Sequence, residues 1–316
     1  MTESAVVRAL HSAAESGAHP AGPCNGCGTT TSVLADRPDG AVVRHGDAVA
    51  KAHAPDTDPA ALEARVAVAA HPLLAGILLP PLAPAAPAAR PVTTWPYGAP
   101  VDPADPDAAP WEEAAALLAR LHTVEQAALP RLPPMRGPAK AARALARMQA
   151  AAPDPSATEP VLRAWRALPA WARDEAPAPG PSYLCHGDLH LGQLVRHPAP
   201  TGPWLLIDID DLGLGDPAWD LARPAAWYAA GLLPPETWTR FLAAYRAAHG
   251  PAVPPDGDPW PRLDVPARAL TVQTAALALA KSTAERRELD EAERAMLDSC
   301  ARIAALPPEL ASDPSS

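Results

Sequence analysis

Basic residues are scarce relative to acidic ones in this sequence of 316 residues. It has 26 Lys and Arg against 36 Asp and Glu, a net charge of -10. A nucleic-acid partner requires a basic face to neutralise phosphates, so this deficit argues against DNA or RNA binding. An acidic surface fits a cationic small molecule, and it fits ordinary solubility equally well.

Long uninterrupted apolar runs are also missing. The most apolar stretch, residues 73–87, is broken by prolines and is too short to span a bilayer. The first 17 residues lack the basic segment and apolar core of a secretory signal. We therefore expect a cytoplasmic protein with no membrane partner.

Cysteine is rare as well, and two of the four residues, Cys24 and Cys27, form a CxxC pair. Such a pair can be half of a zinc site or a redox pair. A closed zinc site needs two more ligands, and Cys185 and Cys300 stand alone in the sequence. The pair lies among Gly, Pro and Asn, so we interpret it as two reduced loop cysteines.

The hydrophobic pattern changes along the chain. Residues 3–17 have helical spacing, and three short β-like runs separated by turn residues then predict an antiparallel meander, at residues 31–35, 41–44 and 48–53. A Pro- and Ala-rich stretch follows, and helical patterns dominate from Trp111 onward. We predict an α+β fold with a small antiparallel β lobe over residues 1–93 and a mainly helical lobe over residues 94–316.

The pattern also predicts a helical region over residues 265–305. It contains the charged run at residues 284–294. We interpret this run as a solvated helix face with i,i+4 pairs, and the alternative is that it borders a substrate pocket.

Residues 184–227 hold the polar groups best suited to chemistry. Two apolar strand-like runs, 193–195 and 204–209, flank a Pro/Gly turn and predict a hairpin. We expect Asp188, Gln193 and Asp208 to lie together at its open end. Such groups serve phosphoryl transfer, but acids also cluster at calcium sites and in solvated turns, and the spacing leaves these alternatives open.

Two motifs in this segment resemble a known family. HGDLHLGQ (186–193) resembles the HGDLHPGN loop of the aminoglycoside phosphotransferase and choline kinase-like superfamily, and IDIDDLGLGDPAWDLA (207–222) resembles its IDWGDAGVGDPAYDLA segment. The superfamily is related to protein kinases. The resemblance implies a bilobal protein-kinase-like fold, ATP, Mg²⁺ and a small hydroxylated substrate.

The resemblance also implies roles for single residues. Asp188 would be the catalytic base, and Asp208 the principal Mg²⁺ ligand. Gln193 stands where most members have an Asn that binds a second metal. The amide oxygen is kept, but the extra methylene puts the second metal site in doubt because Mg²⁺ tolerates little deviation from octahedral geometry.

Other motif positions have lesser implied roles. His186 would brace the catalytic loop, and Asp216 would cap a helix and brace its loop. Asp211 and His190 are candidate substrate contacts, although Asp211 could equally face solvent. Asp210 stands where most relatives have Gly, which leaves its role open.

The resemblance implies a nucleotide site in the N-terminal lobe. Lys51, the only lysine there, would orient the phosphates with Glu63 as its helix partner. Trp95 and Tyr97 would lie at the hinge that meets adenine. The loop at residues 22–31 could cover the phosphates with backbone N–H groups.

The acceptor is left open by these observations. We expect an aminoglycoside or another antibiotic as the acceptor, because the excess of acidic residues favours a cationic molecule. A sugar is the alternative because HGDLHLGQ is also similar to maltokinase-like members, and amino alcohols are a further class. A catalytically silent nucleotide-binding pseudokinase is the competing hypothesis, and we expect a monomer or homodimer.

Overall fold

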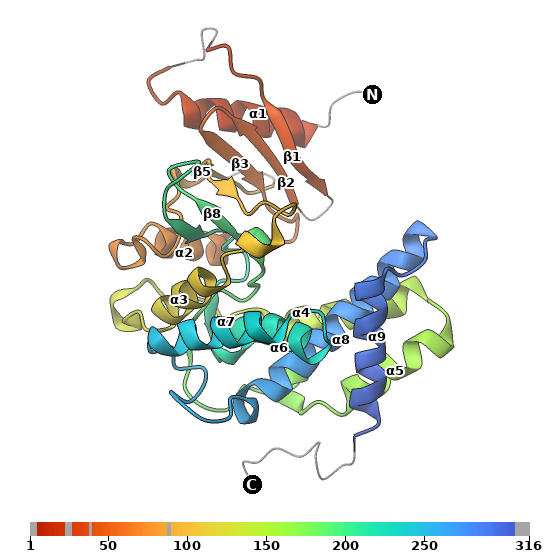
Figure 1. The fold of residues 1–316 in the computed structure, drawn as a ribbon. Coiled ribbons are helices and arrows are strands. Elements are labelled where there is room, and N and C mark those ends of the chain that lie inside the picture. The colour runs from red at the N-terminus through yellow and green to blue at the C-terminus, as the bar shows by residue number, and fades with distance from the viewer. Residues whose placement is uncertain (1–4, 23–26, 38–39, 87–89, 307–316) are drawn as a thin grey trace. The chain divides into compact units, whose positions relative to one another are not determined.

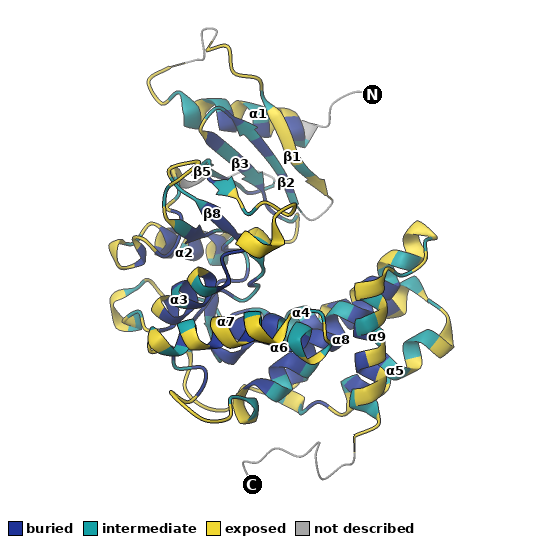
Figure 2. Cartoon of the chain, in the orientation of Figure 1, coloured by how far each residue is buried: buried dark blue, intermediate teal, exposed yellow. Residues whose placement is uncertain are grey.

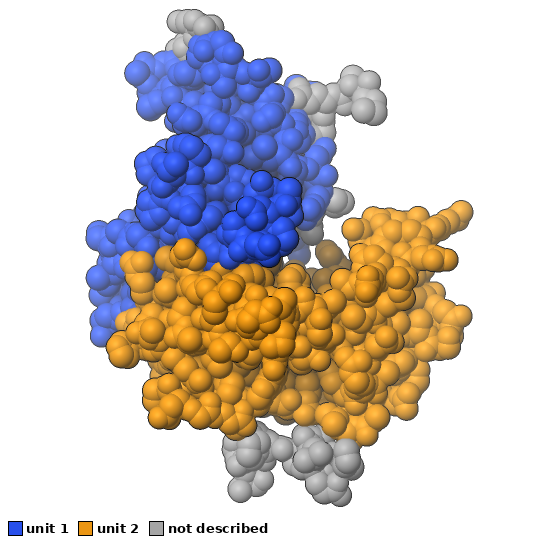
Figure 3. Space-filling view, viewed as in Figure 1, with its two compact units in different colours: residues 1–110, 124–133, 191–210 blue, residues 111–123, 134–190, 211–316 orange. Residues whose placement is uncertain are grey.

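The computed structural model describes residues 5–22, 27–37, 40–86 and 90–306. The chain divides into two compact units (Figure 3). Unit 1 comprises residues 1–110, 124–133 and 191–210, and unit 2 comprises residues 111–123, 134–190 and 211–316. This division differs from the predicted boundary after residue 93, because later segments join the N-terminal residues.

Unit 1 is built on a five-stranded antiparallel sheet with the order β1-β2-β3-β5-β4 (Figure 1). The predicted meander is confirmed. The strands are β1 (Ser32–Arg37), β2 (Gly40–His45), β3 (Ala48–Ala52), β4 (Ala83–Ala86) and β5 (Val92–Pro96).

Helix α1 (Ala5–Ala18) lies across one face of this sheet (Figure 1). Its helical spacing turns Leu10 and Ala14 inward, where they join a core with alternate residues of β2 and β3. Side chains alternate along a strand, so Val49 and Lys51 point to the opposite face. Because α1 covers the first face, side chains that could contact a ligand lie on this opposite face.

Unit 1 also contains α2 (Pro59–Ala69) and a small antiparallel sheet, β6-β8-β9. Asp58 caps α2 by accepting a hydrogen bond from the Ala60 N–H (2.9 Å). The predicted hairpin is confirmed as β8 (Leu194–Arg196) and β9 (Trp204–Leu206). Strand β6 (Ala99–Pro100) pairs with β8, and residues 94–110 belong to unit 1.

Unit 2 is mainly helical and contains one two-stranded sheet. Its elements are α3 (Trp111–His122), α4 (Gly137–Ala151), α5 (Pro155–Arg166), β7 (Tyr183–Cys185), β10 (Gly213–Gly215), α6 (Ala218–Ala229), α7 (Pro235–Ala247), α8 (Trp260–Glu285) and α9 (Glu291–Ala304). Helix α8 contacts α4, α5, α6 and α9, and is buried over much of its length (Figure 2). In the described part of the chain, no helix is long and apolar enough to cross a membrane.

The predicted helical region over residues 265–305 is present as two helices, α8 and α9, with a break between them. Helix α8 ends where Arg286 adopts a left-handed backbone with φ 52°. Helix α9 starts with a capping box in which Asp290 and Glu293 each accept the other's backbone N–H. Much of the charged run is therefore a connection between helices.

Short 3-10 helices complete the described chain. They are η1 (Pro72–Leu74), η2 (Pro106–Ala108), η3 (Gln126–Ala128), η4 (Ala170–Arg173) and η5 (Leu191–Gln193).

Candidate active site

Unit 1 contains a pocket of about 570 Å³ on the sheet face opposite α1. This volume lies within the ~300–1,000 Å³ usual for small-molecule sites. Strands β1, β2, β3 and β5 and the β8–β9 hairpin contribute to its wall. The apolar lining includes Val42, Val49, Leu79, Trp95, Val195 and Ile207, and the polar lining includes Lys51, His53, Gln193 and Asp208.

A network of ion pairs lies beside this pocket. Lys51 Nζ donates to Asp208 Oδ1 at 2.6 Å and lies 3.0 Å from Asp210 Oδ2. His53 Nδ1 lies 2.7 Å from the other oxygen of Asp210, and its Nε2 lies 2.8 Å from Thr93 Oγ1. The sequence interpretation left the role of Asp210 open, and the structure makes it a partner of both Lys51 and His53.

These pairs fix the charges of the network. Burial alone would lower the pKa of Lys51, but the carboxylates of Asp208 and Asp210 outweigh it and raise that pKa. Burial would raise the pKa of Asp210, but His53 and Lys51 hold it below its usual range. At neutral pH the unit therefore presents a protonated Lys51 beside the ionised carboxylate of Asp210.

Asp208 has an unusual backbone conformation, with φ 66° in the left-handed region. Non-glycine residues rarely adopt this region, and such strain concentrates at functional sites. Gln193 Nε2 lies 3.4 Å from Asp208 Oδ2, so the structure brings these two predicted metal ligands together. Carboxylate and amide oxygens are donors that Mg²⁺ accepts, and rotation of the Gln193 amide presents its oxygen, so the pair fits this ion.

The predicted partner of Lys51 on helix α2 is not brought to it. Glu63 is exposed, because the buried side of α2 is formed by residues such as Leu62 and Val66. Within the described residues, the ion-pair partners of Lys51 are Asp208 and Asp210. The predicted pair of Lys51 with Glu63 is therefore not formed in this structure.

Trp95 and Tyr97 both line the pocket, close to the end of β5. The Tyr97 N–H donates to the Asp47 carbonyl at 2.7 Å, and the Tyr97 carbonyl bonds with His197 Nδ1 at 3.0 Å. Its ring lies under the Arg44 guanidinium, with 3.3 Å from the guanidinium carbon to the ring centroid. Both main-chain groups of Tyr97 are thus engaged within unit 1, and its contribution to the pocket is its position in the wall.

In unit 2, the predicted base Asp188 follows β7 and is held at both oxygens. Lys140 Nζ lies 2.8 Å from its Oδ2, and Arg223 Nη2 donates to its Oδ1 at 2.7 Å. Burial would raise the pKa of Asp188, but Lys140 and Arg223 outweigh it and lower that pKa. The carboxylate is therefore ionised and fixed in orientation. His190 lies half-buried two residues further along.

The sequence interpretation missed Lys140 and Arg223, and it misjudged Asp211. Lys140 Nζ also donates to Asp211 Oδ2 at 2.7 Å, and Arg136 Nε lies 2.8 Å from Asp211 Oδ1. Asp211 is buried at 7% exposure. It was predicted to contact substrate or solvent, and it instead anchors two cations of unit 2.

The loop before Asp188 is braced by Asp220. Its carboxylate accepts the backbone N–H groups of His186 (2.6 Å) and Gly187 (2.7 Å), and lies 2.9 Å from His122 Nε2. His186 is fully buried in this loop, and Asp216 accepts a main-chain hydrogen bond at the start of α6 (3.0 Å). Asp220 lies in the second motif, at residues 207–222, but the motif does not show which loop Asp220 braces.

Comparison with known proteins identifies the family. No curated protein matches the chain. Residues 41–263, more than half of the chain, match the phosphotransferase enzyme family. The chain belongs to this family. The predicted superfamily is therefore confirmed, and the chain is an enzyme of phosphoryl transfer to an alcohol group.

Solved structures of this phosphotransferase fold resemble the chain over most of its length. One is a choline/ethanolamine kinase family protein from Mesorhizobium loti (17% identity, TM-score 0.57, covering 89% of this chain and 90% of that chain). Another is a macrolide 2′-phosphotransferase from Brachybacterium faecium (21%, 0.52, 94% and 99%). A third is a mutant of aminoglycoside phosphotransferase APH(4)-Ia in a ternary complex with AMP-PNP and hygromycin B (14%, 0.57, 88% and 95%). They confirm the predicted α+β, protein-kinase-like fold class.

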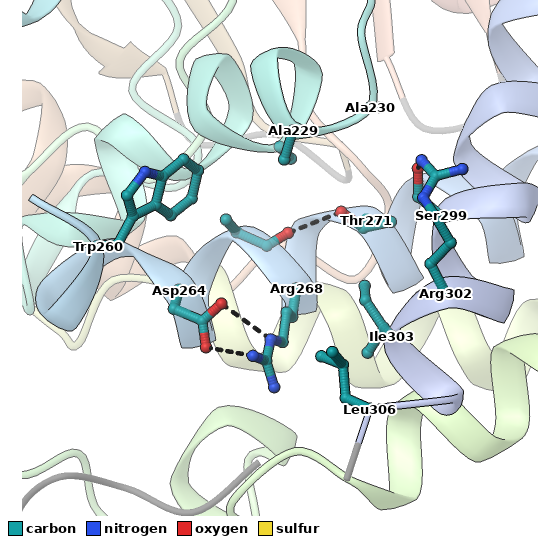
Figure 4. Close-up of a pocket in the computed structure, with 12 residues that line it drawn as sticks. Ala229, Ala230, Trp260, Asp264, Arg268, Thr271, Ser299, Arg302, Ile303 and Leu306 are labelled. Atoms are coloured by element: carbon teal, nitrogen blue, oxygen red, sulfur yellow. Dashed lines mark hydrogen bonds and ion pairs between the residues drawn. The ribbon is translucent and has the colours of Figure 1, made fainter. Parts of the chain in front are cut away.

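Unit 2 of this phosphotransferase contains a second, smaller pocket between α6, α8 and α9 (Figure 4). Trp260 lies at one end of it, and Asp264 pairs with Arg268 along its wall at 2.8 and 2.9 Å. Its volume of about 180 Å³ is below the ~300 Å³ at which small-molecule sites usually begin. Its paired charges and small size give no reason to assign it the acceptor.

Proposed function

We propose that the chain transfers the γ-phosphoryl group of ATP to a hydroxyl of a small molecule in the cytoplasm, with an aminoglycoside or another antibiotic as the first acceptor class. The observation that carries this proposal is the contact of Lys51 with Asp208 and Asp210 beside a pocket of suitable volume. Phosphoryl transfer depends on a cation that orients phosphates and on carboxylates that bind metal. The complex of the aminoglycoside phosphotransferase APH(4)-Ia with AMP-PNP and hygromycin B supports a nucleotide and an aminoglycoside as substrates.

Unit 1 supplies the nucleotide groups in this proposal. Asp208, with Gln193, would hold Mg²⁺, which when bound neutralises charge on the phosphates. Lys51 remains protonated and orients the phosphate oxygens. Asp210 and His53 fix the lysine's second contact, so that its ammonium is positioned before the nucleotide arrives.

Unit 2 supplies the acceptor group. Asp188 orients the attacking hydroxyl and accepts its proton. Its low pKa makes it a weak base, which suits a loose transition state that needs little activation of the nucleophile. Lys140 and Arg223 fix the carboxylate, so orientation is its main contribution.

The test is a coupled ADP-release assay with ATP and Mg²⁺ against aminoglycosides, macrolides, sugars and amino alcohols. We expect release to be stimulated by a cationic antibiotic. Stimulation by sugars alone would show that the acceptor is a sugar, the alternative that the HGDLHLGQ motif favours. Nucleotide binding with a flat panel would favour the silent binder and contradict the proposal.

The first mutational prediction concerns Asp188. Asp188→Asn keeps the shape but removes the charge that orients the hydroxyl, so we expect turnover to fall about 10²- to 10⁴-fold. Calorimetric affinity for AMP-PNP with Mg²⁺ should stay within about twofold, because the nucleotide groups belong to unit 1. Asp256→Asn, the same change at an exposed position of unit 2, is the control. Near-normal turnover in Asp188→Asn would remove this residue from the mechanism.

A further inference from the structure

Three side chains able to bind a metal meet in unit 1, away from the pocket. His19 follows α1, Cys27 precedes β1, and His45 ends β2. Their ligand atoms all lie within 4.8 Å of one another. His45 belongs to the buried face of β2, which packs against α1, whereas Val42 of the same strand lines the pocket on the opposite face. The cluster is therefore separate from the candidate active site.

The spacing of these atoms fits a tetrahedral zinc ion. Cys27 Sγ lies 3.4 Å from His45 Nε2. With Zn–S of about 2.3 Å and Zn–N of about 2.0 Å, the edge between a thiolate and an imidazole of one tetrahedron is roughly 3.5 Å. The rings of His19 and His45 meet edge to face, with centroids 5.5 Å apart. Parallel stacking would place the two rings face to face, whereas the edge-to-face arrangement allows nitrogens of both rings to approach one ion.

The hydrogen bonds around the cluster leave its nitrogens available. His45 Nδ1 lies 2.8 Å from Thr31 Oγ1, the kind of second contact that sets which nitrogen of a ligating histidine carries the proton. With that proton on Nδ1, the lone pair of Nε2 points toward Cys27. The Nε2 atom of His19 is buried and has no hydrogen-bond partner in the described residues. A buried polar atom without a partner is costly, and a bound metal would supply one.

The geometry points to a Zn²⁺ site formed by His19, Cys27 and His45. A thiolate with two imidazoles is a donor set that zinc favours. Binding replaces the thiol proton of Cys27 by the metal, with one proton released and no change of oxidation state. The ion fastens the end of α1 and the segment before β1 to the end of β2.

This site revises the interpretation of the CxxC pair. The two further zinc ligands that the pair lacked in the sequence are His19 and His45, which the fold brings to Cys27. Cys24 lies outside the described residues, and the inference rests on the three ligands alone. The loop predicted to cover phosphates is, in its described part, attached to His45 through Cys27 and Thr31. The inference does not depend on the proposed function, since its readout is metal binding.

The test uses the full chain, stripped of metal by a chelator, reduced, and titrated with Co²⁺ as a spectroscopic probe. We expect one Co²⁺ per chain, with the visible bands of a tetrahedral site and a thiolate-to-cobalt charge-transfer band, all displaced by Zn²⁺. Cys27→Ser should lose the charge-transfer band. His19→Gln and His45→Gln should each weaken affinity by more than about 100-fold, since even loss of an outer contact costs 10- to 100-fold.

Thr31→Val tests the site without touching a ligand. It removes the bond to His45 Nδ1 but keeps the side-chain shape, so we expect about 10- to 100-fold weaker binding in a folded chain. The controls are Cys300→Ala, Cys185→Ala and His71→Gln, which lie outside the cluster and should bind normally.

Three outcomes would overturn the inference. One is no stoichiometric uptake by the reduced wild-type chain. The second is an unchanged charge-transfer band in Cys27→Ser. The third is loss of the band in Cys185→Ala, which would assign the metal to the buried His122, Cys185 and Asp220 group of unit 2.

Discussion

The proposed base of unit 2 depends on a residue far from it in sequence. Lys140, on α4, bridges Asp188 and Asp211 with bonds of 2.8 and 2.7 Å. Such a bridge orients the Asp188 carboxylate and stabilises its charge. Lys140 is thus a positioning residue whose loss should alter both the rate and its pH dependence.

We predict that Lys140→Met lowers turnover by roughly 10- to 100-fold through misorientation of Asp188. Loss of one cation also moves the pKa of Asp188 upward, toward its usual value. The reaction requires the ionised form and fails as pH falls through that pKa, so the acid limb of turnover should move to higher pH. The measurement is turnover against pH over the range in which circular dichroism shows a folded chain.

Lys281→Met is the matched control, because Lys281 is an exposed lysine of the same unit. Its rate and pH profile should equal those of the wild type. A Lys140→Met variant with the wild-type acid limb and rate would show that the bridge is only structural.

Gly187 is required by close packing as well as by its backbone. It has φ 83°, and a Cβ there would lie 2.5 Å from the Asp211 carbonyl oxygen. Gly231 has a similar φ of 78° but open space around the same position. Substitution of Gly231 therefore tests backbone strain alone, whereas substitution of Gly187 adds a steric clash.

We predict that Gly231→Ala costs only the left-handed backbone penalty of about 1–2 kcal/mol in free energy of unfolding. Gly187→Ala should cost more, and should also lower turnover, because the loop that carries Asp188 must shift. Urea unfolding and the ADP-release assay measure the two effects. Equal losses of stability with unchanged turnover in both variants would contradict this account.

The candidate site residues proposed from sequence are those inside a contiguous motif. HGDLHLGQ and the segment after it contain Asp188, Gln193, Asp208 and Asp216. Lys140 was missed because it lies 48 residues before Asp188, and only the fold brings it there. The scarcity of lysine was a usable signal, since the chain has only three lysines, Lys51, Lys140 and Lys281.

At the scale of elements, local signals located helix starts but did not always define helix ends. Asp58 followed by Pro59 is a typical helix-start signal, and α2 begins there. The break between α8 and α9 was missed because residues 265–305 keep helical composition throughout. The signal was present in Asp290 and Glu293, whose spacing is that of a capping box.

We predict that Asp290→Ala destabilises the chain by about 1 kcal/mol, since it removes the bond to the Glu293 N–H at the start of α9. The change should appear as a lower urea midpoint with an unchanged slope. Asp298→Ala is the control, because it makes the same change at an exposed position within the helix. Equal midpoints for the two variants would mean that the cap contributes nothing.

At the scale of the whole molecule, the chain separates into two units whose segments alternate in sequence. The change from β to helical pattern predicted two parts, but it could not assign residues 191–210 to the N-terminal one. That assignment depends on β8 pairing with β6, a contact between segments about 95 residues apart. Gln193 and Asp208 therefore belong to the unit that holds Lys51.

In the proposed function, nucleotide binding is a property of unit 1. We predict that AMP-PNP with Mg²⁺ slows amide hydrogen exchange most strongly in β2, β3, β5 and the β8–β9 hairpin, because these elements line the 570 Å³ pocket. Lys51→Met should abolish the protection, since it removes the cation that orients the phosphates, whereas Lys281→Met should retain it. Protection confined to α6, α8 and α9, which line the small pocket of unit 2, would place the nucleotide there and contradict the assignment of Lys51 and Asp208.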